Sequence, residues 1–181
     1  MKYDFETLID RSEKGSSKWN IMKEKNSVIP DNIAPLSVAD ADIPLAPEIK
    51  DGLIEFLKND VVLGYTDPTD KYYQAVINWM EKRHNYKIKK EWIIISNGIV
   101  PALYDAVNAY TNESDGVIVF TPVYYPFYQA IKTNNRQIVK CPLINKNTNY
   151  TIDFEKFVLL AQNPKNKMVI LCNPHNPVGR V

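Results

Sequence analysis

The end of the chain constrains the fold more than any other stretch. Residues 168–172 form a short apolar run, MVILC, which is typical of a buried strand in a parallel sheet. Two Asn-Pro pairs and a glycine follow directly, in the sequence NPHNPVG over residues 173–179. Proline fixes φ, removes a backbone donor and keeps the preceding residue out of the helical region, so this loop is predicted to be stiff. Open α/β sheets bind ligands at the carboxyl ends of their strands, and we therefore expect a ligand site here.

A second candidate lies where an expected strand leads into a helix. Trp92–Ile95 reads as a strand, and Gly98 follows it just before an apolar helical pattern. The first N–H groups of a helix have no intrahelical partner, so those at Ile99 and Val100 are predicted to form an anion site. A single glycine is no dinucleotide fingerprint and no P-loop lysine follows, which disfavours a nucleotide-binding Rossmann domain.

A third candidate follows the strand expected over residues 117–120. The ring of Tyr124, at the carboxyl end of that strand, could lie flat on an aromatic ligand, although aromatic core packing is the plainer interpretation of Tyr124 and Tyr125. Asn176 adds a side-chain amide from the Asn-Pro loop, for which a simple turn is the plainer interpretation. Taken together, the three strand ends describe a flat aromatic ligand that carries a phosphate at one end and a phenolic oxygen beside a donor.

Alternating strand and helix signals predict the fold class. Helices are expected over residues 46–59 and 69–82, a further strand over 137–141, and a helix over 154–161 that Asp153 caps. The prediction is an α/β fold with a mostly parallel sheet of about four strands and helices on both faces. Residues 1–45, irregular and polar, are assigned to an N-terminal arm and small-domain segment, and 46–181 to part of a large domain.

Composition excludes several classes of function. The 181 residues are 45% hydrophobic and 24% charged, as in a soluble globular domain. The 22 basic and 21 acidic residues give a net charge of +1, which offers no argument for nucleic-acid or membrane partners. Cys141 and Cys172 lie far apart, so we expect two buried free thiols. No metal site, signal segment or long apolar run is expected, and a cytoplasmic location is predicted.

Two motifs resemble those of a known enzyme family. The sequences CNPHNPVGR over residues 172–180 and PVYYPF over 122–127 resemble loops of the class I/II aminotransferase superfamily, in particular its cystathionine β-lyase-like C–S lyases. These enzymes use pyridoxal 5′-phosphate (PLP). The resemblance implies that backbone amides at Ile99 and Val100 hold the cofactor phosphate, that Tyr124 stacks on the ring and that Asn176 lies beside the ring oxygen.

The resemblance continues toward the N-terminus. Gly-Tyr-Thr at residues 64–66 resembles a loop whose tyrosine, here Tyr65, reaches across a dimer interface to the cofactor phosphate. The segments 11–19 and 36–42 resemble the S-x-K-W arm and the V-A-D-M-D segment of the C–S lyase group, with Ala41 where that group has Met. The second segment makes Asp40 a candidate on the substrate side.

The family's Schiff-base lysine and its acid on the pyridine nitrogen follow the Asn-Pro loop, so both are expected beyond Val181. Ser17-Lys18 matches the arm motif instead and is rejected as the catalytic pair. The resemblance implies the amino-terminal part of a homodimeric C–S β-lyase that acts on a small-molecule amino-acid substrate, cystathionine or a related cysteine conjugate. An aminotransferase is the alternative. From another class, an inert fragment could bind a phosphate ligand or a partner chain through an unfinished sheet edge.

Overall fold

The computed structural model describes residues 3–30, 33–59 and 61–181. Contacts within the chain form two compact units, Met1–Asp67 and Pro68–Val181, which are described separately below. The boundary between these units lies after the long helix expected over residues 46–59. The assignment of residues 1–45 to a small-domain segment and of 46–181 to the cofactor domain therefore stays a prediction.

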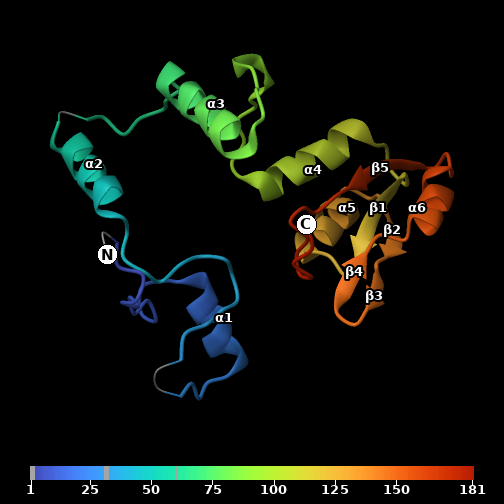
Figure 1. Cartoon of the computed structure of the whole chain (residues 1–181), viewed down its shortest axis with the longest axis horizontal. Helices are drawn as coiled ribbons and strands as arrows, with labels where there is room; N and C mark the ends of the chain where they lie inside the picture. Colours follow the sequence, from blue (N-terminus) through green and yellow to red (C-terminus); the bar gives the residue numbers. More distant parts are fainter. Residues whose placement is uncertain (1–2, 31–32, 60) are drawn as a thin grey trace. The chain divides into compact units, whose positions relative to one another are not determined.

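A three-stranded parallel sheet organises the second unit (Figure 1). The strands β1 (Gly116–Thr121), β2 (Gln137–Pro142) and β5 (Asn166–Ile170) lie in the order β2-β1-β5, and β1 pairs in parallel with both neighbours. The central strand has the sequence GVIVFT and is buried over its first five residues, as expected of a strand covered on both faces. These pairings confirm the predicted parallel sheet.

The alternation of side chains along β1 fills two separate cores. Val117 and Val119 point into a cluster formed with α4 (Ile99–Tyr110) and α5 (Tyr125–Thr133). Ile118 and Phe120 point to the opposite face, where the side chains of α6 (Phe154–Ala161) cover them. Because successive strand residues face opposite sides, this division places helices on both faces of the sheet, as predicted.

Gly116 is required where β1 meets β5. A Cβ atom at this position would lie 1.9 Å from Oδ1 of Asn166 and 2.9 Å from Cγ2 of Val139. The Asn166 amide is itself held, because its Nδ2 donates to the carbonyl of Leu160 at 2.7 Å. The glycine therefore allows the strands to approach at the point where their register shifts.

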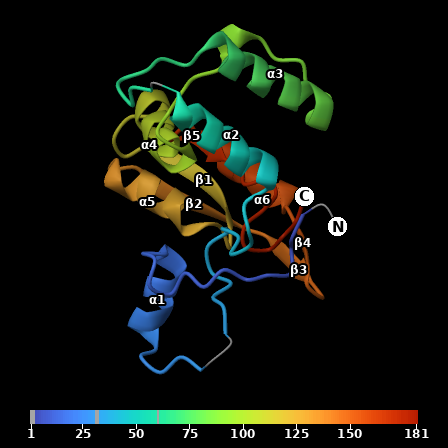
Figure 2. The same cartoon turned by 90° about the vertical axis from the view of Figure 1, so that its left-hand side faces the viewer.

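A short hairpin extends the carboxyl end of β2 (Figure 2) and was not predicted. Its strands, β3 (Ile144–Lys146) and β4 (Asn149–Thr151), pair antiparallel around Asn147 and Thr148. Both turn residues have positive φ, 50° and 67°, which the two-residue hairpin turn requires. Glycine usually marks this turn, so an Asn-Thr pair gives little signal in the sequence.

The prediction of a strand over Trp92–Ile95 was wrong. The chain forms a short 3-10 turn, η1 (Lys90–Trp92), and then continues without a ladder. A strand needs a hydrogen-bonded neighbour, and none of the described residues pairs with Ile93–Ile95. The last strand also ends earlier than expected, at Ile170. Cys172 is consequently half-buried beyond the strand, while Cys141 is a buried free thiol as predicted.

The remaining helices are α1 (Ser17–Lys25) and α2 (Pro47–Lys58) in the first unit and α3 (Asp70–His84) in the second. The latter two confirm the helices expected over 46–59 and 69–82. The cap of α6 is also confirmed, because Oδ1 of Asp153 accepts the N–H of Lys156 at 3.0 Å. Helix α1 lies in the region that the sequence predicts to be irregular, so that prediction is corrected for Ser17–Lys25. Within the described ranges, no helix is long and apolar enough to cross a membrane.

Candidate active site

Two of the predicted loops leave the same edge of the sheet. The strands β1 and β5 are parallel neighbours, so the chain emerges from both at their shared carboxyl edge. Residues 121–125 follow one strand and 171–181 the other. A direct hydrogen bond joins these loops, because the Nε2 atom of His175 lies 2.8 Å from the Pro122 carbonyl oxygen.

The N-terminus of α4 provides the predicted anion donors. Gly98 precedes the helix with φ of 107°, a conformation that favours glycine, and its carbonyl accepts the hydroxyl of Ser96 at 2.9 Å. The N–H groups of Ile99 and Val100 lie in the first turn, where no helical carbonyl is available to them. Helix α4 contacts β5 and runs in the opposite direction to it (Figure 1). The N-terminus of α4 therefore lies toward the carboxyl edge of the sheet.

Tyr124 is held by aromatic neighbours just before α5. Its half-buried ring packs on the core beneath α4 and α5. The ring centroid lies 5.3 Å from that of Tyr125, with the planes at 58°, and 6.3 Å from that of Phe127, edge-on at 75°. Among the described residues its hydroxyl has no hydrogen-bond partner. The ring is therefore oriented by packing rather than by its hydroxyl.

The loop that carries Asn176 is closed on itself. The backbone N–H of Asn176 donates to Sγ of Cys172 at 3.3 Å. Gly179 donates its N–H to the His175 carbonyl, and His175 donates its own N–H to the Arg180 carbonyl, both at 2.7 Å. The side chain of Asn176 is exposed, and its amide has no partner in the described part of the chain. The loop thus fixes the backbone of Asn176 and leaves its amide free to meet a ligand.

The donor set at this edge fits PLP. It offers unpaired backbone N–H groups for a phosphate, an oriented aromatic ring and a free amide, which match the phosphate, the pyridine ring and the ring oxygen. The residues of the three loops, 96–101, 121–125 and 171–181, include no Lys, Asp or Glu. These loops therefore offer groups of the kind that bind and orient PLP, but no lysine to bond to it and no acid for its nitrogen.

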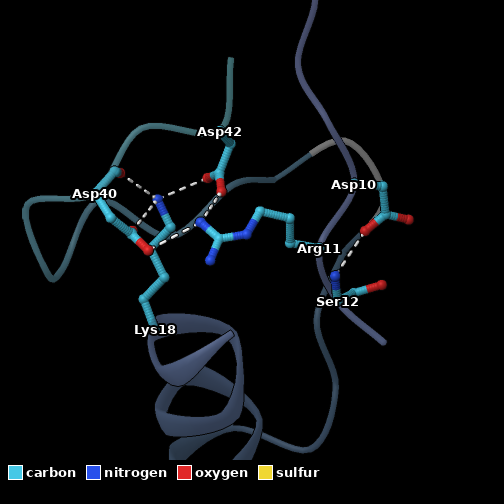
Figure 3. A network of polar contacts seen from close by, with 6 residues as sticks. All are labelled: Asp10, Arg11, Ser12, Lys18, Asp40 and Asp42. Carbon is cyan, nitrogen blue, oxygen red and sulfur yellow. Dashed lines mark hydrogen bonds and ion pairs between the residues drawn. The ribbon is translucent and has the colours of Figure 1, made fainter. Parts of the chain in front are cut away.

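The first unit holds a second polar centre that sequence reasoning missed (Figure 3). Nζ of Lys18, on α1, lies 2.6 Å from Oδ2 of Asp42, 3.0 Å from Oδ1 of Asp40 and 2.8 Å from the Asp40 carbonyl oxygen. The guanidinium of Arg11 bridges the same two carboxylates at 2.8 and 3.1 Å. Side chains of Lys18 and Asp42 are 4% and 7% exposed, whereas that of Asp40 is 40% exposed.

This cluster of four charges changes the interpretation of Asp40. Hydrogen bonds from Lys18, and next from Arg11, hold the pKa of the Asp40 carboxyl below its usual range. Hydrogen bonds to Asp42 and Asp40 raise the pKa of the Lys18 ammonium. Asp40 is thus an ionised, paired carboxylate that ties the 36–42 segment to α1, and its substrate-side role stays a prediction. The signal was the co-occurrence of the K-W arm with an A-D-A-D segment, two motifs that the structure brings together.

Tyr65 lies in the coil after α2, in the first unit, and its side chain is fully exposed. The role of Tyr65 at a dimer interface stays a prediction.

Comparison with known proteins places the chain in a family. The family model of aminotransferase class I and II matches residues 32–181. The chain belongs to this family. Cystathionine beta-lyase PatB of Bacillus subtilis is 40% identical over 177 residues, which are 98% of this chain and 45% of PatB. The crystal structure of cystalysin from Treponema denticola, which contains a PLP cofactor, matches all of the chain with a TM-score of 0.95 and 47% identity.

Aminotransferases are also among the family members that match. The aspartate aminotransferase of Sulfurisphaera tokodaii is 28% identical over 152 residues, 82% of this chain. The chain spans 46% of cystalysin and 45% of PatB, just under half the length of either. The comparisons confirm the predicted resemblance, the fold and PLP as the cofactor of the family's solved neighbours. The individual roles of Ile99, Val100, Tyr124, Asn176, Tyr65 and Asp40 stay predictions.

Proposed function

We propose that the protein containing this chain is a PLP-dependent C–S β-lyase. It would cleave cystathionine or a related cysteine conjugate to pyruvate, ammonia and a thiol. The observation that carries the choice of reaction is the identity of 40% with a cystathionine beta-lyase. The cofactor site in this proposal is supported by the hydrogen bond between His175 and Pro122, which joins the tyrosine loop (residues 121–125) and the asparagine loop (residues 171–181) at the sheet edge.

Each candidate residue has a defined part in this proposal. The N–H groups of Ile99 and Val100 hold the phosphate, and the helix dipole of α4 adds to their attraction. The ring of Tyr124 stacks on the pyridine face, and the amide of Asn176 donates to the ring oxygen. When bound, PLP supplies an electron sink for breaking bonds at the substrate Cα.

Two further residues in this proposal belong to the first unit, and one of them acts from a second copy of the chain. Asp40 stays on the substrate side as a proposal, held in place by Lys18 and Arg11. In a homodimer, Tyr65 would contact the phosphate of the cofactor that the partner subunit binds. The full exposure of the Tyr65 side chain is consistent with such a contact. A cytoplasmic location is part of the same proposal.

The catalytic lysine is proposed to lie outside residues 1–181. Lys18 is a poor candidate, because its buried ammonium is committed to two carboxylates and a carbonyl. A Schiff-base lysine must instead give up its proton to react, and this environment stabilises the protonated form. Residues 1–181 alone would therefore be inactive.

An aminotransferase is the second candidate, favoured by the 28% identity with an aspartate aminotransferase. One experiment separates the two. The full-length protein, purified with PLP, is given cystathionine in the absence of any keto acid. A lyase releases pyruvate and ammonia in equal amounts, and adding 2-oxoglutarate leaves the rate unchanged. An aminotransferase releases no pyruvate and converts 2-oxoglutarate to glutamate. A protein that takes up no PLP, as judged by its visible absorbance before and after borohydride, would contradict both candidates.

A further inference from the structure

The His175 side chain joins two loops that are far apart in the sequence. We propose that His175 is a positioning residue, which fixes the asparagine loop against the tyrosine loop and thereby sets the relative orientation of Asn176 and Tyr124. This inference rests on the proposed function, since both residues are taken to contact PLP. His175 itself contacts neither the cofactor nor the substrate in this scheme.

The direction of the hydrogen bond is set by its acceptor. A carbonyl oxygen can only accept, so Nε2 of His175 must carry the hydrogen that it shares with Pro122 at 2.8 Å. His175 is 6% exposed whereas Pro122 is exposed, so the bond between them is partly buried. The carbonyl before it, that of Thr121, is already occupied by the N–H of Leu143 at 2.9 Å. The His175 ring thus satisfies the first carbonyl that the sheet leaves unpaired after β1.

The backbone on the other side of the bond is equally restrained. Main-chain hydrogen bonds from His175 to Arg180 and from Gly179 to His175 hold the ring's attachment point, and Cys172 holds the next residue. Within the described residues, the His175–Pro122 bond is the one hydrogen bond between residues 121–125 and 171–181. It spans 53 positions of sequence. Tyr124 follows Pro122 by two residues and Asn176 follows His175 directly, so each end of the bond lies within two residues of a proposed cofactor contact.

Removal of the ring donor should therefore loosen both groups together. Loss of the donor to the Pro122 carbonyl, together with two independently moving loops, should weaken PLP binding by about 5- to 30-fold. Core packing alone predicts a different pattern, because a side chain of similar size and shape would then restore binding whether or not it carries a donor.

Three substitutions in the full-length protein separate these explanations. His175→Gln places an amide donor near the position of Nε2, His175→Asn places one near Nδ1, and His175→Phe keeps the ring without any donor. We expect His175→Gln to bind PLP within about threefold of the wild type, and His175→Asn and His175→Phe to bind about 5- to 30-fold more weakly. The exposed His84 on α3 gives the matched control, and His84→Gln should change nothing.

A measurement without cofactor accompanies the binding assay. Hydrogen–deuterium exchange of the apoprotein should rise in both residues 121–128 and 171–181 for His175→Asn, and in neither for His175→Gln. If the wild type binds no PLP, the proposed function fails, while the exchange pattern still decides whether His175 couples the loops. The inference is overturned if all three variants bind and exchange alike, or if His175→Phe matches the wild type. Should His175→Phe fail to fold, equal behaviour of the Gln and Asn variants would overturn it.

Discussion

Replacement of Tyr124 gives the sharpest test of the cofactor site, because the structure separates its contribution to folding from its contribution to binding. Tyr124→Ala removes two aromatic contacts, with Tyr125 and with Phe127. Each such pair is worth about 0.5–1.5 kcal/mol, so the free energy of unfolding of the apoprotein should fall by about 1–3 kcal/mol. Tyr124→Phe keeps both contacts and loses a hydroxyl that has no partner in the described residues, so its stability should change by less than about 0.5 kcal/mol.

The same substitutions should act separately on PLP affinity. Stacking on the ring and shielding it from water should contribute about 1–3 kcal/mol, which makes binding to Tyr124→Ala about 5- to 150-fold weaker. Tyr124→Phe keeps the aromatic face and should bind within a few-fold of the wild type. Urea unfolding of the apoprotein and PLP titration followed by protein fluorescence measure the two quantities independently.

Tyr125→Ala is the matched control for this experiment. The Tyr125 side chain is 64% exposed and shares one of the two aromatic contacts, but it has no proposed contact with the cofactor. It should lose some stability and little PLP affinity. If Tyr124→Ala unfolds more easily yet binds PLP as tightly as the wild type, Tyr124 is a core residue and the stacking argument is refuted.

Three further predictions concern the amide, the charge cluster and the chain by itself. Asn176→Ala should shift the pH midpoint of the cofactor's visible absorption band, because a hydrogen bond to the ring oxygen is lost, whereas Asn173→Ala should not; equal shifts would contradict the assignment. The lowered pKa of Asp40 contributes stability that is present above its ordinary value of 3.8 and is lost as the pH falls through the lowered value. The difference in melting temperature between wild type and Asp40→Asn should therefore be largest above about pH 5 and shrink in acid, and a pH-independent difference would argue against the ion pairs. Residues 1–181 expressed alone should release no pyruvate from cystathionine. Sedimentation should show self-association, because β5 is an edge strand of the described sheet. A soluble monomer with enzymatic turnover would place the catalytic lysine within residues 1–181.

The parts of the fold that could be predicted from sequence are those whose signals are local. The run of residues 117–120 is apolar on both faces, and it became the central strand between two layers of helices. Asp153 marks the start of α6, because a carboxylate at a helix N-cap accepts hydrogen bonds from backbone donors in the first turn. The Asn-Pro loop was recognisable because each proline restricts its own position and the one before it.

The misses depend on partners that a linear pattern does not contain. Trp92–Ile95 has the composition of a strand, but strand formation requires a neighbour and none of the described residues provides one. The helix α1 has no clear apolar stripe and is instead tied by its lysines, since Lys23 donates to the Ser12 carbonyl at 2.9 Å and Lys18 binds the aspartates. In the candidate site, the residues of the three loops could be named from the sequence and their roles stay predictions, whereas the link through His175 required the register of β1 and β5.

The four charges of the first unit restrict how this part of the sequence can change during evolution or engineering. Two cations and two anions balance one another, and the buried Lys18 and Asp42 form the pair least accessible to water. A change at either position alone leaves an isolated charge where hydration is poor. A change at both, such as Lys18→Met together with Asp42→Leu, removes the charges as a pair and leaves Arg11 bound to Asp40 near the surface. Positions 18 and 42 should therefore vary together among relatives, and a redesign for greater stability has to treat them as a single unit.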